Sequence, residues 1–120
     1  MNELKTYADK NIIYTGFISD IATYYKAADI FLNPVLSGGG VKTKIVEAIS
    51  YGTTVISTET GAAGMVKEVC GEKLQIVAYD SWESFERKII KNKSIKNQTP
   101  QEYYNYYFYP NIIERIIRLV

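Results

Sequence analysis

The chain has 120 residues, enough for one domain with a core of its own. Its 47% hydrophobic and 22% charged residues are typical of a globular protein, and 14 basic against 13 acidic side chains leave no net charge that would draw it to nucleic acid. The sequence has no histidine, which excludes Ser/His/Asp triads, Cys/His dyads and most zinc sites. Its one cysteine, Cys70, cannot form an intrachain disulfide, and we expect a core side chain in a reducing, cytoplasmic protein.

Short β-type runs alternate with helical periodicity from the start of the chain. Residues 11–15 are rich in β-branched side chains and predict a first strand, which ends at Gly16. Ser19 stands where it can cap a helix whose apolar residues recur at helical spacing. Residues 30–33 predict a second strand, which stops at Pro34.

A run of glycines separates this second strand from a predicted helix over about residues 41–51. Gly52 is well suited to end that helix. Residues 53–57 predict a third strand, and residues 59–70 a turn with a short helix.

The last third of the chain continues the alternation. Residues 73–79 predict a fourth strand, and Asp80 resembles the cap of a helix that turns Trp82, Phe85 and Ile89 inward. A second capping box, at Thr99, predicts another helix, and we expect the tyrosine-rich stretch that follows to pack onto the domain. Isoleucines at helical spacing predict an amphipathic terminal helix over residues 111–119.

This alternation predicts an α/β fold, in which helices flank a mostly parallel, Rossmann-like sheet. We expect a single domain over residues 1–120 that lacks the opening strands of a doubly wound sheet. An uncovered sheet edge would follow, and with it self-association or marginal stability.

Three consecutive glycines, Gly38, Gly39 and Gly40, open the helix that follows the second strand. Glycines let a backbone approach a ligand, and a helix start offers unpaired N–H groups to an anion. Lys42 and Lys44 are unfavourable in a first helical turn unless an anion compensates them. The pattern therefore predicts a phosphate site, although a glycine-rich turn with surface lysines remains the alternative. Neither the Walker spacing nor the dinucleotide pattern is present.

Glu47 lies about a turn and a half into the same helix. A carboxylate there can accept hydrogen bonds from both hydroxyls of a ribose. The alternative is a surface pair with Lys44, three residues earlier, worth only a few tenths of a kcal/mol, as is usual for such pairs.

The run NPVLSGGGVKTKIVEAISYGTTVISTETGAAG, residues 33–64, resembles the donor-site signature of group 1 glycosyltransferases with the GT-B fold. Upstream, YTGFISD at 14–20 and YYKAADIFLNP at 24–34 are similar to further stretches of that family, in the same order. The resemblance is strongest over residues 14–64. It implies that this chain is part of the C-terminal, donor-binding half of such an enzyme.

The resemblance also implies roles for individual residues. Glu47 would hold the donor ribose, and Lys42 and Lys44 would neutralise phosphate charge. Backbone N–H groups of the glycine loop would bind the diphosphate or the sugar, and the backbone of an earlier turn would lie beside the nucleobase. The implied donor-binding residues are Gly16, Phe17, Ile18, Gly38, Gly39, Gly40, Val41, Lys42, Lys44 and Glu47.

Two departures from the family pattern affect this assignment. The family usually carries two glutamates separated by seven residues, and the first of these positions is Gly39 here. The family's phosphate-binding Arg and Lys, and its acceptor domain, normally precede the region seen in this chain. The resemblance names no catalytic residue.

The implied activity is that of a retaining glycosyltransferase of the hexosyltransferase type. It would transfer a sugar from a nucleotide-diphosphate sugar to a hydroxyl acceptor, in bacterial-type polysaccharide biosynthesis, on a glycan or on a lipid-linked acceptor. No Asp-x-Asp stretch occurs, so we expect no metal and no cofactor besides the donor. We expect the chain to be inactive without its acceptor domain. We expect any association with the inner face of the membrane to come from parts of the full-length protein that this chain lacks.

Two alternatives remain open from the sequence. One is a non-catalytic nucleotide-binding or interaction module derived from such a domain, and detectable nucleotide binding would separate the two interpretations. The other is a different Rossmann-like enzyme, such as a sugar-nucleotide epimerase or a small NAD-dependent protein, and the missing dinucleotide fingerprint argues against the NAD-dependent version. No apolar run approaches the ~18 residues that a membrane-spanning helix needs.

Overall fold

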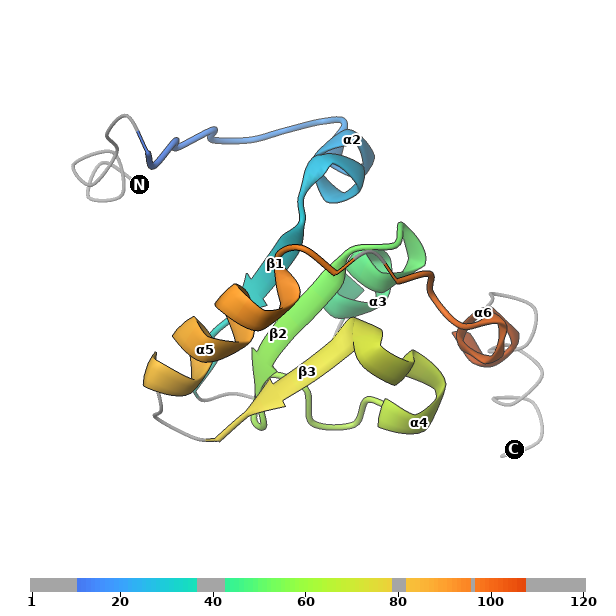
Figure 1. The fold of residues 1–120 in the computed structure, drawn as a ribbon. Helices are drawn as coiled ribbons and strands as arrows, with labels where there is room; N and C mark the ends of the chain where they lie inside the picture. The colour runs from blue at the N-terminus through green and yellow to red at the C-terminus, as the bar shows by residue number, and fades with distance from the viewer. Residues whose placement is uncertain (1–10, 37–42, 79–81, 96, 108–120) are drawn as a thin grey trace.

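A computed structural model describes residues 11–36, 43–78, 82–95 and 97–107 of the chain. Helices and strands alternate through this part of the chain, as the sequence predicts (Figure 1). The predicted α/β class is confirmed. The elements are α2 (Ile21–Ala27), β1 (Ile30–Asn33), α3 (Thr43–Ser50), β2 (Thr54–Thr58), α4 (Lys67–Cys70), the 3-10 turn η1 (Gly71–Lys73), β3 (Leu74–Val77), α5 (Trp82–Asn92) and α6 (Gln101–Tyr107).

The sheet has three parallel strands in the order β1-β2-β3. All five residues of the central strand, β2, are buried, although only Val55 and Ile56 are apolar and the other three are the hydroxyl residues Thr54, Ser57 and Thr58. The register pairs Asn33 with Ser57 and Thr58 with Val77, so the strands end together at one edge of the sheet. This carboxyl-terminal edge is where open parallel sheets bind ligands.

The strand predicted over residues 11–15 is not formed, so that prediction is wrong. These residues extend away from α2, at the end of the molecule where β1 begins (Figure 1). Ile13 is 80% exposed there. A strand exists only where a neighbouring strand pairs with it, and residues 11–15 do not belong to the described sheet of β1, β2 and β3.

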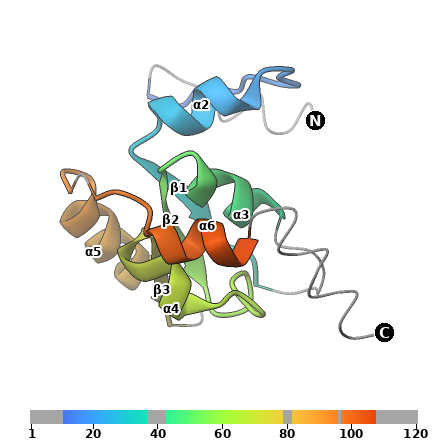
Figure 2. The ribbon, with the colours of Figure 1, turned by 90° about the vertical axis from the view of Figure 1, so that its right-hand side faces the viewer.

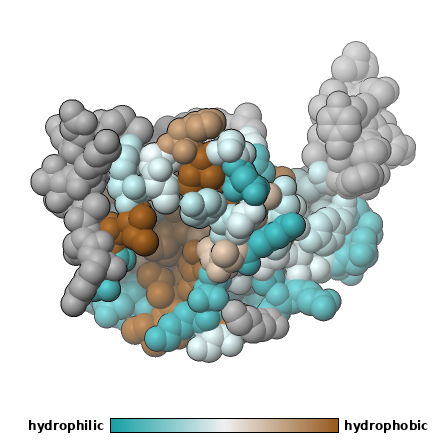
Figure 3. Space-filling view, turned by 90° about the horizontal axis from the view of Figure 1, so that it is seen from above, coloured by the Kyte–Doolittle hydropathy of each residue, from teal (hydrophilic) through white to brown (hydrophobic). Residues whose placement is uncertain are grey.

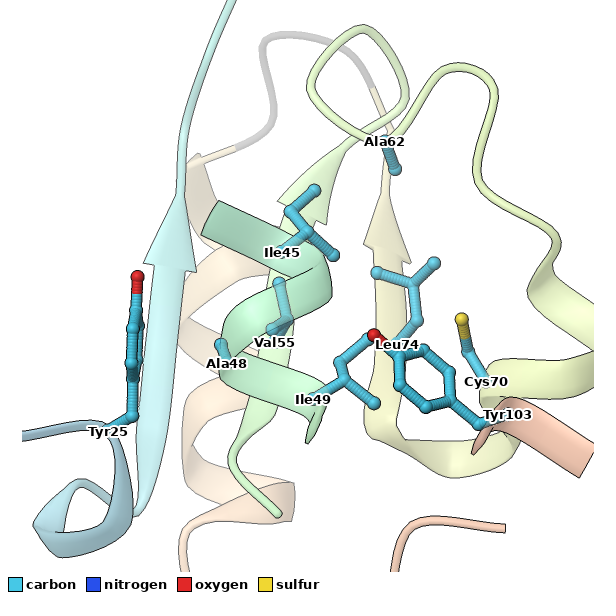
Figure 4. Close-up of a cluster of buried hydrophobic side chains, with 9 residues drawn as sticks. All are labelled: Tyr25, Ile45, Ala48, Ile49, Val55, Ala62, Cys70, Leu74 and Tyr103. Carbon is cyan, nitrogen blue, oxygen red and sulfur yellow. The ribbon is translucent and has the colours of Figure 1, made fainter. Parts of the chain in front are cut away.

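One face of the sheet is covered by α3, α4 and α6, which pack a continuous core against it (Figures 2 and 4). Val55 and Leu74 point from the strands into this core, and Ile45, Ala48 and Ile49 reach it from α3. Their spacing along α3 is that of one buried helical face, as predicted.

Tyr103, on α6, joins the same core with 1% of its surface exposed, and its hydroxyl donates to the carbonyl oxygen of Val46 at 2.6 Å. The described tyrosines of α6 therefore pack onto the domain, as expected. Cys70 is fully buried beside Tyr103 (Figure 4), and burial raises the pKa of its thiol from an ordinary value near 9 to about 11. The prediction of a core cysteine is confirmed.

Among the described helices, α5 alone covers the opposite face of the sheet (Figure 2). Ile56 and Val77 point to this side because successive residues of a strand face opposite ways. Phe85 is buried against them, and Ile89 is half-buried, as predicted. Trp82 was expected inward but is 59% exposed, because it begins the helix beyond the end of the strands that would cover it.

An apolar groove of about 390 Å³ runs between β1 and α5. α5 packs on β2 and β3, so the α5 side of β1 is left open and Leu32 is 46% exposed. Seen from above, the molecular surface contains apolar areas that are bordered by polar residues (Figure 3). The residues that line the groove are Leu32, Pro34, Trp82, Phe85, Glu86, Ile89 and Ile90.

Two helix caps differ from the predictions. Asp20, not Ser19, caps α2: its carboxylate accepts hydrogen bonds from the backbone N–H and the hydroxyl of Thr23, and these hydrogen bonds lower the pKa of Asp20. The hydroxyl of Thr99 donates to the carbonyl oxygen of Ile49 at 2.7 Å. It therefore satisfies a backbone carbonyl group at the end of α3, a contact that the predicted capping box does not include. The predicted cap at Asp80 and the terminal helix lie outside the described residues.

Candidate functional site

A polar network joins the carboxyl ends of β1 and β2. The side-chain amide of Asn33 donates to Ser57 Oγ at 3.1 Å, and Ser57 Oγ lies within hydrogen-bond distance of the Thr58 carbonyl oxygen at 2.9 Å. The hydroxyl of Thr58 donates to the carbonyl oxygen of Val35. The described start of the loop after β1 is thereby tied to the end of the central strand.

Gly61 closes this network. Its backbone N–H donates to Thr58 Oγ1 at 2.9 Å. A Cβ atom at position 61 would lie 2.5 Å from Asn33 Nδ2 and 2.6 Å from Ser57 Oγ, so only glycine fits without a shift. No motif in the sequence predicts a role for these residues. The available signal was the pair of polar strand ends, an asparagine before Pro34 and Ser57–Thr58 before a glycine turn.

α3 begins directly after the loop and carries two of the predicted site residues. Its buried face is set by Ile45, Ala48 and Ile49, which leaves Lys44 exposed and Glu47 half-buried. Both side chains belong to the described part of α3, and no ion pair joins them to each other. The surface-pair alternative for Glu47 therefore has no support, and its carboxylate stands at the edge of the core.

The phenol of Tyr25 on α2 is the neighbour of Glu47. Burial raises the pKa of Tyr25, and the negative charge of Glu47 and a hydrogen bond to that carboxylate raise the pKa further. Tyr25 is therefore protonated at neutral pH, and its hydroxyl keeps a proton that it can donate. Helical spacing in the sequence marks Tyr25 only as an apolar position on the buried face of its helix.

The described site residues do not all lie together. Gly16 has a φ of 69°, in the left-handed region that favours glycine, and Phe17 beside it is 94% exposed. Both lie on the extended segment before α2, away from the carboxyl ends of the strands (Figure 1). Ile18, on the same segment, is half-buried. The structure thus places Lys44 and Glu47 on one helix and Gly16, Phe17 and Ile18 on another part of the molecule.

The glycine loop itself lies outside the described residues. This applies to five of the predicted donor-binding residues, whose roles stay predictions: Gly38, Gly39, Gly40, Val41 and Lys42.

Within the described parts of the chain, no group of three or more His, Cys, Asp or Glu side chains is arranged to hold a metal ion. No helix among those same residues has the length and apolar character needed to cross a membrane.

A protein-family model with the description "Glycosyl transferases group 1" matches residues 1–92. The match covers most of the chain and includes every described element from α2 to α5. No curated protein and no solved structure matches the chain significantly. The matched range holds both Glu47 and the Asn33–Ser57–Gly61 network.

Proposed function

Because the chain belongs to the group 1 glycosyl transferases, we propose that it is the domain that binds the sugar donor in a retaining transferase of the hexosyltransferase type. The donor is a nucleotide-diphosphate sugar, and the acceptor is a hydroxyl group of a glycan, a polysaccharide or a lipid-linked sugar. Residues 1–120 act as one domain that supplies the donor half of the site. An acceptor-binding domain supplies the other half, and the chain is inactive without it.

The position of Glu47 is the observation that carries this proposal. α3 follows β1 of a parallel sheet, and Glu47 is half-buried on its flank without an ion pair to Lys44. A fixed carboxylate accepts two hydrogen bonds well from the vicinal hydroxyls of a ribose.

The diphosphate binds at the start of α3. The first turn of this helix contains no acidic residue, and Lys44 is exposed in it. The dipole of α3 and the positive charge of its lysine stabilise the negative charge of the leaving diphosphate, and no metal is required for this stabilisation. During transfer, the bond between the anomeric carbon and the diphosphate oxygen breaks and a bond to the acceptor oxygen forms. The acceptor proton passes to the departing phosphate.

The enzyme works in bacterial-type polysaccharide biosynthesis on the cytoplasmic side, where nucleotide sugars are the donors. Contact with the inner face of the membrane comes from other parts of the full protein.

An NMR titration of the labelled chain with UDP, GDP and ADP and their sugar conjugates tests donor binding. We expect shifts over residues 38–47 with one nucleotide, which identifies the base. Shifts over residues 16–18 would show that the extended segment closes on the nucleobase. Saturating binding without turnover, even with an acceptor domain added, would favour the alternative of a non-catalytic nucleotide-binding module. No shift at millimolar ligand would refute the proposal.

Glu47→Gln tests the ribose contact directly. Hydrogen bonds to charged groups contribute about 1.5–3 kcal/mol, so we expect binding to weaken by about 10- to 100-fold. The matched control is Glu102→Gln, at an exposed glutamate on α6. Equal affinities for the two variants would show that Glu47 does not contact the nucleotide.

A further inference from the structure

Tyr25 is the one buried residue of α2, with 6% of its surface exposed. Its ring stacks on Tyr51 with centroids 5.9 Å apart and an interplanar angle of 15°, and it meets Phe31 edge-on at 5.7 Å. Its backbone carbonyl oxygen accepts a hydrogen bond from the hydroxyl of Thr53. The tyrosine is therefore held from three sides before any ligand arrives.

The stacking partner shows which face of α3 Tyr25 covers. Tyr51 stands four residues after Glu47, and its backbone N–H donates to the carbonyl oxygen of Glu47 at 3.1 Å. Residues four apart in a helical turn lie on the same side of it. A ring stacked on Tyr51 thus lies along the side of α3 that carries Glu47, and Figure 4 shows the Tyr25 side chain alongside β1 with its hydroxyl toward the carboxyl end of that strand.

We propose that Tyr25 is a positioning residue for the donor site: its phenol donates a hydrogen bond to one oxygen of the Glu47 carboxylate and so orients the carboxylate toward the ribose hydroxyls. This inference rests on the proposed function, in which Glu47 holds the ribose. A carboxylate has about four acceptor positions, so one bond to Tyr25 leaves room for two ribose hydroxyls. Because the hydrogen bond already holds the Glu47 side chain in one rotamer, less conformational entropy is lost when the ligand binds.

The test uses the full chain, the best-binding nucleoside diphosphate of UDP, GDP and ADP, and its 2′-deoxy analogue. Tyr25→Phe keeps the ring and removes only the hydroxyl. We expect it to weaken binding of the ribonucleotide by about 3- to 10-fold and to reduce the preference for ribose over 2′-deoxyribose by a similar factor. The matched control, Tyr24→Phe, changes an exposed tyrosine on the same helix and should alter neither value.

A purely structural role for Tyr25 predicts a different result. Loosened packing between α2 and α3 would weaken both nucleotides equally, and an unchanged ribose preference would therefore overturn the proposal. In a Glu47→Gln background, removal of the Tyr25 hydroxyl should cost much less than in the wild type, because the charged acceptor is gone. An equal cost in both backgrounds would also overturn it.

A ligand-free measurement separates this proposal from the proposed function. The ¹³C chemical shift of the Glu47 carboxyl carbon should change in Tyr25→Phe and stay constant in Tyr24→Phe, since only the first variant loses a donor to that carboxylate. An unchanged shift would overturn the contact even if nucleotides bind normally. If the shift changes but the wild type binds no nucleotide, the contact stands and the proposed function, with the ribose role, is refuted.

Discussion

Replacing Gly61 by alanine would place a methyl carbon 2.5 Å from Asn33 Nδ2, 2.6 Å from Ser57 Oγ and 3.1 Å from Thr58 Oγ1. Ser57 and Thr58 are fully buried on the central strand, so their oxygen atoms have little space into which to move. The half-buried amide of Asn33 can swing away more easily, but only by breaking its hydrogen bond to Ser57.

Three contributions set the size of the effect. Overpacking a tight site costs about 1–3 kcal/mol. Loss of the Asn33–Ser57 hydrogen bond adds about 1 kcal/mol. The φ of Gly61 lies outside the left-handed region, so alanine can adopt this backbone conformation. Alanine also lowers the conformational entropy of the unfolded chain, which stabilises the folded state by about 0.4–1 kcal/mol. We therefore expect Gly61→Ala to lower the free energy of unfolding by about 2 kcal/mol, a large part of the 5–15 kcal/mol typical of a domain.

Urea unfolding followed by circular dichroism measures this change. The Asn33→Ala/Ser57→Ala background is the control, because it removes the two closest atoms. There the added methyl group should cost almost nothing or stabilise the fold. If Gly61→Ala costs about 2 kcal/mol in both backgrounds, the clash is not the cause and the reasoning fails.

Three further predictions follow from burial and hydrogen bonding. Burial holds the Cys70 thiol protonated up to about pH 11, whereas the unfolded thiol ionises from about pH 9, so stability should fall over this interval. Cys70→Ala should flatten that fall in urea titrations; identical pH slopes would contradict the assignment. Tyr103→Phe should lower the free energy of unfolding by about 1 kcal/mol, through loss of the hydrogen bond to Val46. Tyr104→Phe is its control and should cost less, because that hydroxyl bonds to Ser50 at the surface. Finally, the open edge of β1 should make the chain self-associate, and Leu32→Lys should weaken that association in light scattering; a wild type that stays monomeric at all concentrations would refute this.

The order of the elements could be predicted from the sequence because its signals are local. The strand over residues 30–33 is recognised by its apolar run and by Pro34, and α3 by the spacing of its buried residues. Gly52 was predicted to end this helix, and its φ of 88° is in the region that glycine tolerates best. The family resemblance, too, depends on motifs read along the chain, and the family match confirms it.

Other features depend on residues distant in the chain, which no local pattern specifies. Residues 11–15 have a strand sequence, yet they are not part of the described three-stranded sheet, because strand pairing depends on residues elsewhere in the chain. The hydroxyl of Thr99 resembles a helix cap but bonds to Ile49, 50 residues earlier.

The candidate site shows the same division. Glu47 could be named from the sequence, since it belongs to a contiguous motif, and Lys44 likewise. Tyr25, the neighbour of Glu47, could not be named from the sequence, because only the packing of α2 on α3 brings Tyr25 and Glu47 together. The network of Asn33 and Ser57, 24 residues apart, arises only when β1 and β2 pair in register. Local periodicity determines which segments become helices and strands, whereas the polar contacts around the site depend on how those segments pack.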